Sequence, residues 1–274
     1  MLLNKKFLFV LMAIIIWTLA LPSSGCHIGA LAPQQKSGSF PLDLAQNSVD
    51  DMYNGCEDKM EEEVAKWLEK EKKGNFGKAW NKSEQYYNNK WATTTSTLKK
   101  EQIMAVHAYT LEMPPIYAEF NKAVRTQKSE YMTKFQYHAF HFYLTMALRS
   151  LKPKAAECVT TYRRTKCRFE TGINREVRFG GFTSSSLGSY SSPGLFGNQS
   201  CFEIITCFGA DISEFSKFKL EKEVLIPPYE VFKVTDIQKR SQKNSLPCEV
   251  VYNLESTNKF HSELNCALTD ESDL

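Results

Sequence analysis

Apolar residues along the chain follow two different spacings, which divide it into a helical half and a strand-rich half. Between residues 51 and 150 they recur every three to four positions, the period of a helix that buries one face. Pro115 suits the first turn of a helix, and Pro153 ends one. The pattern predicts helices over residues 61–72, 99–110, 116–125 and 131–152.

After Pro153, short segments rich in β-branched and aromatic residues alternate with loops of Gly, Ser and Asn. The pattern predicts strands over residues 159–166, 176–185, 201–208, 224–234 and 249–254. Helices followed by strands are typical of the α+β class. We therefore expect one domain over residues 51–266, with a helical part over 51–152 packed on a strand-rich part over 153–266.

The two ends of the chain differ from this domain. Residues 1–25 have the pattern of a signal peptide, because two lysines precede a short apolar run that small residues follow. The run is short for a membrane span, so secretion is expected, with an uncleaved anchor as the alternative. Residues 26–50 are expected to form a loose arm. The acidic tail, residues 267–274, shows no GPI signal, and we expect no membrane anchor in the mature chain.

Composition narrows the function classes. With 42% hydrophobic residues the chain can bury a sizeable core. The net charge falls from +3 to +1 once Lys5 and Lys6 leave with the signal peptide, so the body has no electrostatic case for binding nucleic acid. Eight cysteines without zinc-type spacing favour disulfides and no metal. Sequons at Asn81 and Asn198 predict a glycoprotein.

Motifs for Rossmann, P-loop, α/β-hydrolase and zincin chemistry do not occur. Three polar marks remain at predicted strand ends: an arginine pair at 163–164, a Ser-rich stretch at 183–187, and Glu221-Lys222-Glu223. Each mark alone is typical of an exposed strand edge or turn. If both glutamates begin a strand, its two-residue period places their carboxylates on one face. Together the marks bring an arginine, a serine and two carboxylates to one sheet.

This ordered set of arginine, serine and Glu-x-Glu resembles the arginine-specific mono-ADP-ribosyltransferases, a vertebrate ecto-enzyme family related to several bacterial toxins. The resemblance covers residues 50–266 and includes Val-Arg-Phe-Gly at 177–180, Phe-Thr-Ser-Ser-Ser-Leu at 182–187 and the stretch 223–229. It implies transfer of ADP-ribose to arginine, with NAD or NADP as co-substrate and no permanently bound cofactor. The implied acceptors are arginine-containing proteins.

The resemblance also implies a role for each marked residue. Arg163 matches the arginine that holds the NAD phosphates, and Ser184 matches the serine that contacts the nicotinamide-side ribose and supports the glutamate. Glu223 matches the catalytic glutamate. Glu221 matches the acidic residue linked to arginine as acceptor.

Two further positions concern the nicotinamide. Phe196 is a candidate for the aromatic residue beside it. The family usually has a glycine after the phosphate-binding arginine, and the backbone of that glycine touches nicotinamide. Here Arg164 takes that place, and we expect its backbone to contact nicotinamide. Its side chain is large enough to crowd the pocket and so to change the affinity for NAD.

The residue types agree with this chemistry. A fixed carboxylate such as Glu223 stabilises the positive charge that develops on the ribose as nicotinamide leaves. Glu221 can pair with an incoming guanidinium and help remove its proton, and Arg163 can neutralise a pyrophosphate. Two alternatives stay open. One is NAD glycohydrolysis at the same site, and the other is a catalytically weak secreted binding protein.

The resemblance implies two disulfides, Cys56–Cys266 and Cys158–Cys207. The first would close a loop of about 210 residues and tie both ends of the domain together.

Four cysteines remain, and two of them, Cys167 and Cys201, have no clear family counterpart. If the strands at 159–166 and 201–208 pair antiparallel, Cys167 and Cys201 fall at roughly the same level, so a third bridge between them is expected. Cys26 and Cys248 remain. They either pair, or Cys26 leaves with the signal peptide and Cys248 becomes a free thiol. A further alternative is that all four are reduced and packed as small apolar groups.

Overall fold

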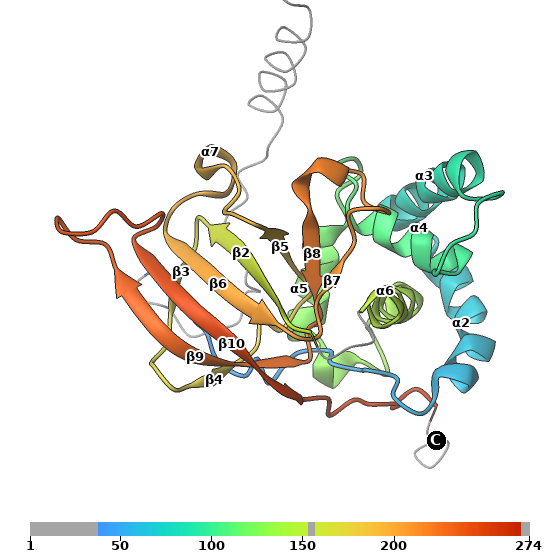
Figure 1. Ribbon diagram of the computed structural model, residues 1–274. Coiled ribbons are helices and arrows are strands. Elements are labelled where there is room, and N and C mark those ends of the chain that lie inside the picture. Colours follow the sequence, from blue (N-terminus) through green and yellow to red (C-terminus); the bar gives the residue numbers. More distant parts are fainter. Residues whose placement is uncertain (1–37, 153–156, 270–274) are drawn as a thin grey trace, which may run out of the picture.

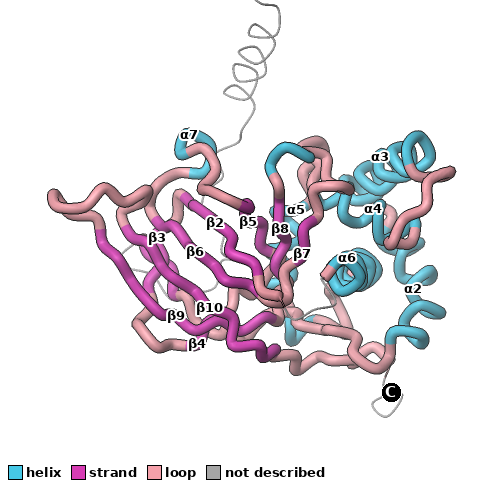
Figure 2. Tube along the Cα trace, in the orientation of Figure 1, coloured by secondary structure: helices cyan, strands magenta, loops and turns pink. Residues whose placement is uncertain are grey.

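The computed structural model describes residues 38–152 and 157–269. A helical part and a large twisted sheet lie side by side, which is the α+β arrangement expected (Figure 1). Figure 2 shows the strands gathered on one side and the helices on the other. Within these residues, no helix is long and apolar enough to cross a bilayer.

The helical part contains the four predicted helices and one more. Its elements are α2 (Glu57–Glu71), α3 (Gly74–Lys90), α4 (Lys100–Tyr109), α5 (Tyr117–Thr126), the 3₁₀ turn η1 (Lys128–Glu130) and α6 (His138–Leu151). We did not predict α3, because few of its 17 residues are buried and two glycines interrupt its pattern. The helix predicted from residue 131 begins only at His138. There the buried Glu71 accepts the N–H groups of Ala139 and Phe140 and so caps α6.

The main sheet has eight strands in the order β4-β9-β10-β6-β2-β5-β8-β7. They are β2 (Val159–Thr165), β4 (Glu176–Val177), β5 (Thr183–Leu187), β6 (Ser200–Thr206), β7 (Ala210–Asp211), β8 (Glu223–Ile226), β9 (Glu230–Lys239) and β10 (Val250–Phe260). Two predicted strands are each split in two. The first breaks at Gly180, whose φ of 68° favours glycine, and the second breaks after Ile226, where two prolines cannot donate to a ladder.

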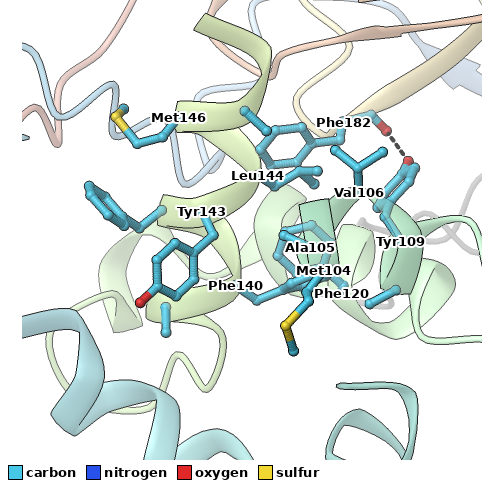
Figure 3. Packing of buried hydrophobic residues seen from close by; sticks show 14 of the residues in the cluster. Met104, Ala105, Val106, Tyr109, Phe120, Phe140, Tyr143, Leu144, Met146 and Phe182 are labelled. Carbon is cyan, nitrogen blue, oxygen red and sulfur yellow. Dashed lines mark hydrogen bonds between the residues drawn. The ribbon is translucent and has the colours of Figure 1, made fainter. Parts of the chain in front are cut away.

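Helix α6 forms the centre of the helical core, with 11 of its 14 residues buried. Figure 3 shows its aromatic side chains packed against α4, α5 and Phe182, which lies just before β5. A second cluster covers the other part of the sheet and includes Phe202, Phe232 and Leu254. The sheet strands nearest the helices therefore rest on a rigid apolar support.

The expectation of a loose arm does not hold for residues 38–50. Strand β1 (Ser39–Pro41) pairs in parallel with β3 (Arg168–Glu170). Asp50 forms a fully buried ion pair with Arg178, and its other carboxylate oxygen accepts the N–H groups of Glu263 and Leu264. Ser48, one of the polar residues of this segment, donates its hydroxyl to the carbonyl of Gly180 over 2.9 Å. The rest of the arm and residues 1–25, which were predicted to be a signal peptide, lie outside the described residues.

The structure contains the Cys56–Cys266 and Cys158–Cys207 bonds. The bridge expected between Cys167 and Cys201 is wrong, because Cys201 bonds to Cys248.

Strands β2 and β6 do pair antiparallel, but Cys201 lies opposite Arg164 and beside Val251 of β10, which brings it next to Cys248. Cys167 follows three residues after Arg164, beyond the end of β2. Cys167 is disulfide-bonded too, and no described cysteine is free. Because Cys248 bonds to Cys201, both alternatives for Cys248 are wrong, the pairing with Cys26 and the free thiol. Cys26 lies outside the described residues.

Candidate active site

Strands β2 and β5 separate at the centre of the sheet. They pair only through Thr161 with Leu187 and Tyr162 with Ser186. Beyond this point β2 continues along β6 and β5 continues along β8. Arg163 lies on β2 at this point, and its Nη1 donates to the carbonyl oxygen of Ser184 on β5 over 2.6 Å. The two strands therefore separate next to Arg163 and Ser184, two of the residues that the sequence analysis singled out.

Glu223 lies on the neighbouring strand, at the first position of β8 and in register with Ser186. Its side chain is 92% buried, and it hydrogen-bonds to Ser184 and to Ser216. Burial raises the pKa of Glu223 to about 7, although the two serine hydroxyls and the charge of Arg163 act in the opposite direction. The structure therefore joins arginine, serine and glutamate in one contact chain.

Buried polar groups of the helical part lie next to the row formed by Arg163, Ser184 and Glu223. Tyr109, the last residue of α4, donates to the carbonyl of Phe182 over 3.0 Å (Figure 3). It accepts a hydrogen bond from Asn121 over 2.9 Å. It also hydrogen-bonds to Ser184, and burial raises its pKa to about 12. A neutral hydroxyl therefore links the helices to the serine of the site.

Helix α5 adds a second arginine. Asn121 and Arg125 are spaced i, i+4, so they share one face of the helix. A Cβ on Gly181 would lie 3.0 Å from Arg125 Nη1 and 3.1 Å from Asn121 Oδ1, so a side chain there would crowd both. Burial lowers the pKa of Arg125, as does the nearby charge of Arg163. We did not assign Tyr109, Asn121 or Arg125 to the site from the sequence. For Asn121 and Arg125 the signals were their i, i+4 spacing on a predicted helix and the similarity of residues 120–125 to the family.

The two carboxylates do not share a strand face, contrary to the prediction. Glu221 ends the 3₁₀ turn η2 (Lys219–Glu221), and Lys222 adopts the left-handed conformation with φ 46° before β8 begins. Glu223 is buried and Glu221 is exposed, yet the charge of Glu221 still helps to raise the pKa of Glu223. Partial removal of the Glu221 carboxylate from water raises its pKa, and the charge of Glu112 adds to the effect.

The loop that carries Glu221, residues 212–222, rests on the helical part. The N–H of Lys217 donates to Thr110 Oγ1 over 2.9 Å, and the ring of Phe215 lies 4.9 Å from that of Trp91. At its far end, the carbonyl of Lys222 accepts the N–H of Leu187 over 3.0 Å. The position of Glu221 relative to Glu223 is therefore set by contacts on both sides of the loop.

The side chain of Arg164 points away from that of Arg163, because neighbouring residues of a strand face opposite sides. It is 93% buried on the outer face of the sheet, where Nη2 donates to the carbonyl of Pro247 over 2.9 Å. Its side chain therefore does not crowd the space between β2 and β5.

Phe196 lies at the end of α7 (Pro193–Phe196), a short helix packed against β2. In Figure 1 this helix stands above the ends of β2 and β5. The ring is 39% exposed. Its role beside nicotinamide stays a prediction.

Comparison with known proteins defines the class to which this fold and site correspond. The family model of the NAD:arginine ADP-ribosyltransferases matches residues 42–259, and the chain belongs to this family.

Among its relatives, the erythroblast NAD(P)(+)–arginine ADP-ribosyltransferase of Gallus gallus is 35% identical over 245 residues, which is 81% of each chain. The human ecto-ADP-ribosyltransferase 5 is 34% identical over 93% of this chain and 89% of its own. A crystal structure of the eukaryotic mono-ADP-ribosyltransferase ART2.2, a mutant in complex with NADH, superposes with a TM-score of 0.69. It is 35% identical over 83% of this chain and 98% of its own.

Proposed function

We propose that this protein transfers ADP-ribose from NAD, or from NADP, to arginine side chains of proteins and releases nicotinamide. The observation that carries the proposal is Glu223, a buried carboxylate held by Ser184 where β2 and β5 separate. Membership of the NAD:arginine ADP-ribosyltransferase family supports it, as does the related ART2.2 structure with NAD.

Arg163 and Arg125 are suited to hold the pyrophosphate of NAD. The two guanidinium groups lie close enough for the charge of Arg163 to lower the pKa of Arg125. A pyrophosphate between them would neutralise this repulsion and accept forked hydrogen bonds. Ser184, which contacts both Arg163 and Glu223, would then face the ribose attached to nicotinamide.

In the reaction, the bond between ribose C1 and the nicotinamide nitrogen breaks, and nicotinamide leaves with the electron pair. The ionised Glu223 stabilises the cationic ribose. A guanidinium nitrogen of the acceptor then attacks C1 and loses a proton. Glu221, exposed on the neighbouring loop, pairs with the arriving guanidinium and accepts that proton as a general base.

Water in place of the acceptor would give NAD glycohydrolysis at the same site. A binding protein without turnover is the remaining alternative. Incubation of the full chain with labelled NAD and agmatine distinguishes the three: labelled ADP-ribosyl-agmatine indicates transfer, free ADP-ribose indicates hydrolysis, and unchanged NAD indicates a binding protein.

Glu223→Gln tests the central assignment, because it keeps size and hydrogen bonding but removes the charge. Turnover should fall by about 10² or more, as when one preorganised electrostatic group is lost, whereas NAD affinity should change much less. Steady-state kinetics and calorimetric titration with NAD measure the two effects. Turnover within about threefold of wild type would refute the role of Glu223.

Glu221→Gln separates the two carboxylates. Transfer to agmatine should fall by about tenfold or more, because the guanidinium loses its charged partner, while hydrolysis of NAD should be retained. Both products are quantified from one reaction mixture. A parallel fall of both activities would show that Glu221 has no acceptor-specific role.

We also propose that the protein is a secreted glycoprotein. Its relatives include ecto-enzymes by name, and disulfides suit an oxidising compartment. Asn81 and Asn198 are exposed, as a glycan requires, although the serines of both sequons, Ser83 and Ser200, are buried.

A further inference from the structure

Arg164 is buried on the outer face of the sheet, where a charge needs specific partners. Its guanidinium has two: the carbonyl oxygen of Pro247, 2.9 Å from Nη2, and the ring of Tyr190, whose centroid lies 5.8 Å from Cζ. The second distance is within the range of a cation–π contact. The two partners come from segments almost 60 residues apart, so one side chain of β2 binds both.

The segment that contains Tyr190 connects β5 to β6, and we call residues 188–199 the strap. The strap leaves β5 three residues after Ser184 and is tied to that strand by a 2.8 Å hydrogen bond between Ser186 and Ser191. It passes through α7 and then crosses the end of β2. There, a Cβ on Gly197 would lie 2.8 Å from the Cα of Lys166. The strap therefore spans the end of β2, the strand of Arg163.

The outer side of the strap has one packed anchor. The ring of Tyr190 lies 5.1 Å from that of Tyr162 and packs against the cluster of Cys201, Cys248 and Val251. The Cys201–Cys248 bond fixes the hairpin segment that supplies the Pro247 carbonyl. By contrast, Leu195 is only half-buried and Phe196 is exposed. The link from Arg164 to Tyr190 therefore holds the first part of the strap, whereas backbone hydrogen bonds of Asn198 and Gln199 hold its end.

We propose that Arg164 is a positioning residue for NAD: it holds the strap in place through Tyr190, so that the strap is ordered before NAD binds. The inference rests on the proposed function, since it concerns NAD binding at the same site. A segment that is already ordered loses less conformational entropy when NAD binds. The apparent affinity for NAD also falls by the fraction of molecules in which the segment is misplaced. We expect an effect on binding rather than on chemistry, because Arg164 faces the side of β2 opposite to Arg163.

The test uses the full chain with four substitutions. Arg164→Leu removes the charge but fills the buried space, and Tyr190→Leu removes the ring from the other side of the contact. Tyr190→Phe keeps the ring. Arg240→Leu is the matched control, because Arg240 binds the same hairpin through Glu249 and the carbonyl of Leu246. Circular dichroism and thermal melting verify that each variant folds.

We expect Arg164→Leu and Tyr190→Leu each to raise KM for NAD roughly five- to tenfold with kcat within about twofold, since the fraction of competent molecules falls. Hydrogen exchange in peptides covering the strap should speed up in both. Tyr190→Phe and Arg240→Leu should resemble wild type. The double variant of Arg164→Leu and Tyr190→Leu should be no worse than either single variant, because the two side chains form one contact.

The inference is overturned if Arg164→Leu changes neither KM nor exchange in the strap. It is also overturned if the two leucine substitutions are additive, or if Arg240→Leu has the same effect. Failure of the proposed function is a separate outcome, because it would show as absent NAD cleavage by the wild-type chain. In that case, hydrogen exchange and calorimetric titration with NAD still decide whether Arg164 holds the strap and assists binding.

Discussion

Ser216 favours the ionised form of Glu223. It is buried in the loop before β8, and its hydroxyl is one of two that hydrogen-bond to this carboxylate and lower its pKa. Even with both hydroxyls, burial holds the pKa of Glu223 at about 7. Only the ionised form can stabilise a cationic ribose, so kcat/KM for NAD should decline as the pH falls below about 7.

Ser216→Ala removes one hydrogen bond to a charged group. Such a bond contributes roughly 1.5–3 kcal/mol, and 1.36 kcal/mol corresponds to one pKa unit, so the pKa should rise by at least about one unit. With a shift from about 7 to about 8, the ionised fraction at pH 7 falls about fivefold. At pH 9 it falls by only about a tenth.

The assay is the pH dependence of kcat/KM for NAD between pH 5.5 and 9.5, which reports on the free enzyme. The acidic limb of the variant should move to higher pH, and the plateau at high pH should match wild type. An unmoved limb would refute the argument. So would an equal loss at pH 7 and pH 9, because that would indicate displaced geometry rather than altered ionisation.

Two further predictions concern stability. Arg178→Met leaves Asp50 buried without its counter-charge, which should cost about 3–5 kcal/mol and lower Tm by about 10 °C in a scanning melt; a change below about 2 °C would contradict this. Burial raises the pKa of Glu71 to about 8. Between about pH 5 and 8 the folded state therefore retains a proton that the unfolded chain loses, and the stability that Glu71 contributes falls as the pH rises through this range. Glu71→Gln should flatten that slope in urea unfolding, and an unchanged slope would count against the assignment.

The division into helices and strands could be predicted from the sequence, because periodicity and β-branching act over a few neighbouring residues. The order of Arg163, Ser184 and Glu223 along the chain was equally evident. Gly180 and the prolines after Ile226 marked breaks within two predicted strands, but not where the chain goes after each break.

The features that only the tertiary structure decided all depend on contacts between distant segments. Cys201 bonds to Cys248 because β10 lies beside β6, and no local pattern encodes strand order. Asn121 and Arg125 join the site because α5 packs against the turn that enters β5.

The face on which Arg164 lies, and the position of Glu221, were decided in the same way. Arg164 is buried because a strap and a hairpin from other parts of the chain cover the outer face of β2. Glu221 leaves the strand because Lys222 turns the backbone just before β8 pairs with β5. Short-range periodicity specifies the helices and strands. Strand order and packing specify which side chains meet, because the interactions that determine them form between residues tens to hundreds of positions apart.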